Sequence, residues 1–101
     1  MKFECVCGTL VLDQTDALPH KAQFVADQDW SSLLETIDEL SAQSRARPEE
    51  NSMAITSALL RFSRIAYQCR ECGRIWINDK AGRLHSFAPD SGTTPRDLFT
   101  K

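Results

Sequence analysis

The sequence predicts an α+β fold in which a small antiparallel sheet carries an inserted pair of helices. Two cysteine-containing segments, "FECVCGTLVL" from residue 3 and "YQCRECGRIWI" from residue 67, each have the pattern of a hairpin. The residues between them place apolar side chains at helical spacing. A chain of 101 residues suits one compact domain, so we expect a single domain over residues 1–101.

Both cysteine segments follow one pattern: an aromatic residue, any residue, a cysteine, a short spacer, a second cysteine, a glycine and then apolar residues. The matching residues are Phe3, Cys5, Cys7 and Gly8 in the first segment and Tyr67, Cys69, Cys72 and Gly73 in the second. The flanking residues alternate or are β-branched, which predicts hairpins over residues 1–13 and 65–78. The glycine supplies the positive φ that a tight turn around a thiolate needs.

Two close cysteine pairs also predict one metal site. The sequence begins without an apolar segment of signal length, so we expect a cytoplasmic protein, in which stable disulfides are disfavoured. Structural Zn²⁺ takes four ligands tetrahedrally and binds thiolates well. We therefore predict one structural zinc ion, although iron stays an open alternative because soft sulfur ligands also suit iron. The predicted ligands are Cys5, Cys7, Cys69 and Cys72.

The segments "CVCG" and "CRECG" resemble the double knuckle of the zinc-ribbon families. The resemblance covers roughly the first dozen residues and residues 65–87, and it implies a small sheet built around structural zinc. This chain departs from the usual ribbon because its first pair is Cys-x-Cys and because 61 residues separate Cys7 from Cys69, where about 15–20 are common. Closing a longer loop costs only about 0.6 kcal/mol per doubling of its length, so the fold tolerates the insertion.

The insertion, about residues 27–62, is predicted to hold two helices after a short strand in "KAQFVAD". The first helix is predicted to begin with Asp29 or Ser31 as its cap, and Pro48 to break the chain before a second helix capped by Ser52. We expect the apolar stripe of the first helix to pack on the sheet. The stripe consists of Trp30, Leu33, Leu34, Ile37 and Leu40.

The residues after the second hairpin are predicted to add a last strand at about residues 84–88, following a turn that contains Gly82. The tail, residues 89–101, resembles a helix start, with Thr94 as cap and Pro95 at the first helical position. Leu98 and Phe99 are expected to dock on the core.

Charge is distributed unevenly along the chain, with a balance of −5 over residues 27–50 and +4 over residues 61–83. The simplest interpretation is that both charged segments form solvated surfaces that bind no partner. The interpretation we favour is a non-catalytic module that binds, neutralises or scaffolds another protein by complementary charge. In size and charge the chain resembles small bacterial immunity proteins, which implies a basic toxin as partner. The predicted contact residues are Asp27, Asp29, Glu35, Asp38 and Glu39.

Nucleic-acid binding is the first alternative. In it the basic residues contact phosphates and Trp76 stacks on an unpaired base. The basic residues are Arg70, Arg74, Lys80 and Arg83.

A redox dithiol at Cys69 and Cys72 is the second alternative. A reactive Cys-x-x-Cys pair begins a helix, whereas "GRIWIND" here has the pattern of a strand.

The sequence predicts no enzymatic activity. His20 and His85 lack the spacing of a metal-ligand pair, and no phosphate-binding loop or nucleophile elbow is present. A zinc ion with four protein thiolates has no open position for water. We expect neither a small-molecule substrate nor a membrane partner.

Overall fold

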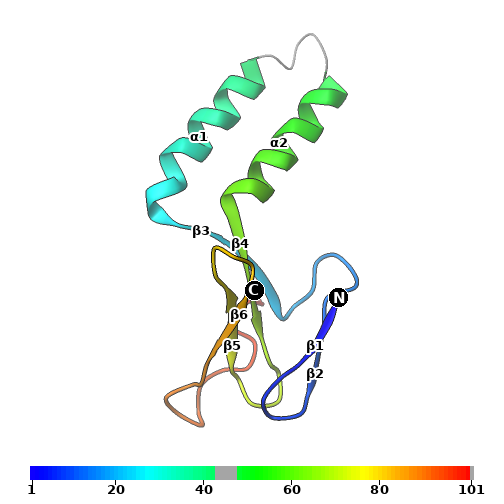
Figure 1. The fold of residues 1–101 in the computed structure, drawn as a ribbon, viewed down its shortest axis with the longest axis vertical. Helices are drawn as coiled ribbons and strands as arrows, with labels where there is room; N and C mark the ends of the chain where they lie inside the picture. Colours follow the sequence, from blue (N-terminus) through cyan, green and yellow to red (C-terminus); the bar gives the residue numbers. More distant parts are fainter. Residues whose placement is uncertain (43–47, 101) are drawn as a thin grey trace. The chain divides into compact units, whose positions relative to one another are not determined.

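The computed structural model describes residues 1–42 and 48–100, and it confirms the predicted α+β fold class (Figure 1). The chain divides into two compact units. The first consists of Met1–Gln23 with Ile65–Lys101, and the second of Phe24–Arg64. In the described part of the chain, neither helix combines the length and apolar character that crossing a membrane requires.

Two antiparallel sheets contain the six strands of the described residues. Strands β1 (Lys2–Glu4) and β2 (Leu10–Leu12) form a hairpin in which Phe3 lies opposite Val11. The second sheet has the order β3-β4-β5-β6. Its strands are β3 (Lys21–Val25), β4 (Ser63–Gln68), β5 (Ile75–Asn78) and β6 (Leu84–Phe87). The second predicted hairpin, formed by β4 and β5, is therefore flanked by β3 on one side and by β6 on the other.

The core of the first unit is built around Cys5, Val11, Tyr67 and Cys69, all buried. Phe3 packs against this cluster, with its ring centroid 5.3 Å from that of Tyr67 and 5.2 Å from that of Trp76 in edge-to-face geometry. Such aromatic pairs contribute about 0.5–1.5 kcal/mol beyond the area they bury. The aromatic residues that precede the two cysteine pairs, Phe3 and Tyr67, thus contact each other in the same core cluster as Cys5 and Cys69.

The second unit contains helices α1 (Asp27–Ala42) and α2 (Pro48–Phe62), which pack against each other (Figure 1). Leu33 and Ala58 are its buried side chains among the described residues. Trp30 and Leu34 keep 50% and 45% of their surface exposed. The expectation that the whole apolar stripe of this helix is covered by packing on the sheet is therefore wrong for Trp30 and Leu34.

Both helices begin earlier than predicted. Helix α1 starts at Asp27, so Asp29 and Ser31 lie within it and do not cap it. Asp27 and Asp29 instead place two negative charges in the first turn, where they interact favourably with the helix dipole. Pro48 begins α2 and does not break the chain, because proline needs no amide hydrogen bond in the first turn. Ser52 lies inside α2, where its carbonyl oxygen accepts a hydrogen bond from the Thr56 hydroxyl.

The predicted helix start at Thr94 and Pro95 does not form. The buried Gln68 side chain binds the tail instead, since its Nε2 donates to the Pro95 carbonyl at 2.8 Å and its Oε1 accepts from the Leu98 amide at 2.9 Å. These bonds use backbone groups that a helix would need. Phe99 is half-buried, whereas Leu98 remains 48% exposed, so the predicted docking fails for Leu98.

Asp13 links the first hairpin to β4 and β3. Its carboxylate accepts hydrogen bonds from the Tyr67 hydroxyl and from Lys21, whose Nζ lies 2.9 Å from Oδ2. The Tyr67 hydrogen bond first, and Lys21 second, hold the pKa of Asp13 below its usual range. Burial first, and the Asp13 carboxylate second, raise the pKa of Tyr67, which keeps the hydroxyl protonated as a donor.

We predict that Tyr67→Phe lowers the free energy of unfolding by about 1.5–3 kcal/mol, because it removes a hydrogen bond to a charged group. A depressed carboxyl pKa stabilises the fold above the unfolded pKa of about 3.9 and loses that effect only as pH falls through the folded value. The loss should therefore be constant between about pH 6 and pH 8. Urea unfolding of metal-loaded protein across that range measures it, and a loss that changed with pH would contradict this role of Asp13.

Candidate metal centre

The structure brings all four predicted sulfur ligands together. The Sγ atoms of Cys5, Cys7, Cys69 and Cys72 lie within 4.8 Å of one another. The Cys5 and Cys72 sulfurs are 3.6 Å apart, as are those of Cys7 and Cys69. Ligands of a tetrahedral zinc–sulfur site, each about 2.3 Å from the ion, lie about 3.8 Å from one another. The cluster therefore has the dimensions of a single four-coordinate metal centre.

The two cysteine loops have the same backbone hydrogen bonds. In each, the glycine amide donates to the carbonyl of the first cysteine at 2.9 Å, from Gly8 to Cys5 and from Gly73 to Cys69. The first cysteine's own amide then bonds a carbonyl of the returning chain, that of Thr9 or of Arg74. Gly8 has φ 93° and Gly73 has φ 80°, which confirms the positive φ predicted for both. These two turns direct the sulfur atoms of both cysteine pairs toward the same position.

The four thiols differ in exposure and acidity. Cys5 and Cys69 are buried, Cys72 is half-buried and Cys7 is exposed. The hydroxyl of Thr9, 3.2 Å from the Cys7 sulfur, and its backbone amide lower the pKa of Cys7 to about 6. Burial raises the pKa of Cys72 to about 12. A bound cation removes this difference, because metal coordination deprotonates thiols outright.

Thr9 is a site residue that the sequence analysis did not identify. Hydrogen bonds to metal-bound groups orient the ligands and tune the affinity for the metal. The signal in the sequence that could have identified Thr9 is a hydroxyl residue two positions after Cys7, directly before β2.

The set of four sulfur ligands limits which metal the site could hold and what that metal could do. Soft sulfur ligands suit zinc or iron, and four protein ligands leave no coordination position for a substrate. A metal ion held by all four sulfurs would therefore have a complete tetrahedral set of protein ligands.

The residues predicted for nucleic-acid binding differ in their exposure. Arg70, Lys80 and Arg83 are exposed and Arg74 is half-buried. Trp76 is half-buried against the core, with Phe3 on its ring and its Nε1 buried without a hydrogen-bond partner among the described residues. Its packing favours a structural role over base stacking.

The two histidines, His20 and His85, lie apart from the sulfur cluster, and each lies close to one hydrogen-bonding group of another residue. His85 is exposed on β6 and pairs with Asp79 at 2.7 Å. His20 Nε2 lies 2.6 Å from the carbonyl oxygen of Leu12. Strand β5, and no helix, follows Cys72, so the pair lacks the helix dipole that activates a redox dithiol.

The acidic residues predicted to contact a partner all lie on α1. Asp27 and Asp29 occupy its first turn, and Glu35, Asp38 and Glu39 are further along it. Helical periodicity separates the later three, because Asp38 continues the row of Trp30 and Leu34 while Glu35 and Glu39 lie on another face.

The family model for a domain of unknown function, DUF8617, matches residues 1–91. The chain belongs to the DUF8617 family. The match includes both cysteine loops and the helical unit, so the metal centre and the insertion are parts of one DUF8617 domain sequence. No curated protein and no solved structure matches this chain.

We predict that Cys69→Ser abolishes tight Zn²⁺ binding, because it removes a buried ligand, whereas Thr9→Val lowers the affinity about 10-fold by removing a hydrogen bond to the exposed ligand. Competition with a chromophoric chelator measures both affinities. Thr15→Val, at an exposed threonine away from the sulfurs, is the matched control and should bind as the parent does. Equal affinities for the Thr9 and Thr15 variants would remove Thr9 from the site.

Replacing each of the two turn glycines by alanine should lower the free energy of unfolding by a different amount. Gly8→Ala should lower the free energy of unfolding of metal-loaded protein by about 1–2 kcal/mol, the cost of a positive φ for an alanine. Gly73→Ala should cost more, because its Cβ would lie 3.1 Å from Arg96 Cδ, whereas the space beside Gly8 is open. Gly92→Ala, in open space without a positive φ, is the control. Urea unfolding gives the ranking, and a Gly8→Ala variant as stable as the Gly92→Ala control would contradict it.

Proposed function

We propose that this DUF8617 chain is a non-catalytic, zinc-stabilised binding module whose helical unit contacts a basic protein partner. The observation that carries the proposal is a row of residues on α1 that combines exposed apolar and acidic side chains. Asp27, Trp30, Leu34 and Asp38 follow one another at spacings of three, four and four residues. Residues at these spacings are neighbours on a helix surface.

The apolar members of this row are large and open to solvent. Trp30 and Leu34 expose 50% and 45% of their surface. Exposed apolar residues that cluster and are flanked by polar ones mark sites of protein association, and tryptophan is prominent among residues that dominate binding energy. The row therefore has the composition of a contact surface with an apolar centre and an acidic rim.

Charge defines the partner. Helix α1 carries five acidic residues and no lysine or arginine. Complementary charge across an interface accelerates association and excludes partners of the wrong sign. We therefore expect a partner that presents an apolar side chain between basic ones, as a basic toxin neutralised by an immunity protein would.

The outer face of α2 offers a second apolar patch. Met53 and Leu60, seven residues apart, are 73% and 60% exposed. Ser52, Met53, Thr56 and Ser57 line a shallow cavity of about 260 Å³ on this face. A partner that reaches around the helical unit would find an apolar contact on each helix.

The test is affinity capture from the native host, with mass spectrometry of the captured proteins. Trp30→Ala with Leu34→Ala should abolish capture of the basic partner, and Asp38→Lys should weaken it. Glu39→Lys is the matched control, because it makes the same charge change on another face of the same helix and should leave capture intact. Circular dichroism confirms that each variant keeps its helices.

Two results would reject the proposal. One is capture that survives the Trp30 and Leu34 substitutions. The other is a chain that instead shifts oligonucleotides in a steeply salt-sensitive way, which depends on Arg70 and Arg83 and would establish the nucleic-acid alternative.

A further inference from the structure

The outer edge of β2 carries backbone groups that no strand of the described residues pairs with. In an antiparallel pair, residues alternate between exchanging hydrogen bonds with the partner strand and directing their N–H and C=O away from it. Met1 exchanges both bonds with Asp13, and the Cys5 amide bonds the Thr9 carbonyl. In this register Phe3 exchanges bonds with Val11, and the N–H and C=O groups of Leu10 and Leu12 point outward.

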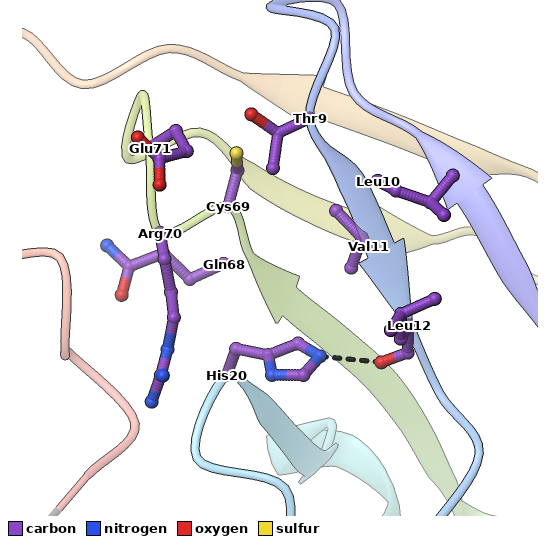
Figure 2. A pocket seen from close by; sticks show the side chains of 9 residues that line it. All are labelled: Thr9, Leu10, Val11, Leu12, His20, Gln68, Cys69, Arg70 and Glu71. Atoms are coloured by element: carbon purple, nitrogen blue, oxygen red, sulfur yellow. Dashed lines mark hydrogen bonds between the residues drawn. The ribbon is translucent and has the colours of Figure 1, made fainter.

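A cavity of about 280 Å³ lies beside this edge (Figure 2). Residues 9–12 of the first hairpin form one wall, and residues 68–71 with His20 form the other. Leu10 and Leu12 are 51% and 41% exposed, so the wall formed by β2 offers apolar side chains as well as backbone hydrogen-bonding groups. A cavity of this volume is just below the usual range of about 300–1,000 Å³ for drug-sized ligands.

His20 closes one end of this groove. Its Nε2 lies 2.6 Å from the Leu12 carbonyl oxygen, so this outward-pointing carbonyl already has a hydrogen-bond partner (Figure 2). The Leu10 N–H, the Leu10 C=O and the Leu12 N–H form no hydrogen bond with other residues that the structure describes. An incoming chain therefore meets the hydrogen-bonding pattern of a strand edge centred on Leu10.

Arg70 is the one lysine or arginine among the described residues that line the groove, and Glu71 beside it is the one acidic residue there. The exposed side chain of Arg70 lines the cavity and forms no ion pair within the described part of the chain. Gln68, which also lines the cavity, has its amide already bound to Pro95 and Leu98 of the tail. The guanidinium is thus the strong donor left for a ligand, and guanidinium groups bind carboxylates in a planar, bidentate manner.

We propose that this groove binds a short extended peptide segment as a third strand on β2, with an acidic side chain of that segment paired to Arg70. Strand addition at a free edge gains affinity from main-chain hydrogen bonds and specificity from neighbouring side-chain pockets. The site lies in the first compact unit, so it is independent of the α1 surface proposed above. The two surfaces bind ligands of opposite charge.

The test uses the zinc-loaded protein and a blocked peptide, acetyl-Thr-Val-Glu-Val-Thr-amide, in an NMR titration of the backbone amides. The largest shifts should fall on Leu10, Leu12 and Arg70. Arg70→Gln should weaken binding about three- to fivefold, the effect expected of one exposed ion pair. Arg83→Gln, at an exposed arginine outside the groove, should bind as the parent does.

Two altered ligands separate strand addition from binding of a carboxylate alone. The same peptide N-methylated at its central residues cannot donate to the Leu10 carbonyl and should lose binding. Acetyl-glutamate amide, which keeps the carboxylate but has too few backbone groups to form a strand, should bind much more weakly. Equal binding of either ligand, shifts confined to other residues, or no shift at millimolar peptide would overturn the proposal.

Discussion

Four sulfur atoms at one point join two chain segments that are separated by 61 residues between Cys7 and Cys69. Each strand of the first hairpin has three residues, and such a hairpin is marginal in water by itself. Two of the four buried residues in the core cluster, Cys5 and Cys69, are themselves candidate ligands. A core this small stabilises weakly, whereas a structural zinc ion contributes about 10–16 kcal/mol. A cation held by the four sulfurs would thus stabilise the first unit more than its apolar packing does.

Such a cation would explain how the chain accommodates a long insertion. A metal ion bound by both cysteine loops would fix them relative to each other, so the helical residues need only leave the sheet after β3 and rejoin it at β4. The surface of these helices exposes large apolar residues such as Trp30 and Met53, and the partner contact proposed above would cover the part around Trp30. In the first unit, β1 and β2 form a sheet of two strands, which leaves the outer edge of β2 open beside the groove that Arg70 lines.

Local chemistry made the metal centre predictable from sequence. Paired cysteines, each pair followed by glycine, specify the turn at Gly8 and at Gly73 without reference to the rest of the chain. Features that depend on distant partners were not predictable. The tail residues Thr94 and Pro95 carry a helix signal, but Gln68, buried in β4, binds the tail backbone. The bond from Tyr67 to Asp13 and the open edge at Leu10 likewise follow from register and packing, which sequence periodicity does not encode.

X-ray absorption spectroscopy at the metal edge, on protein purified without added metal, tests the account most directly. The account predicts one zinc per chain, surrounded by four sulfur atoms at about 2.3 Å. Well-folded protein without stoichiometric metal, or a metal with nitrogen or oxygen ligands in place of any of the four sulfurs, would contradict it.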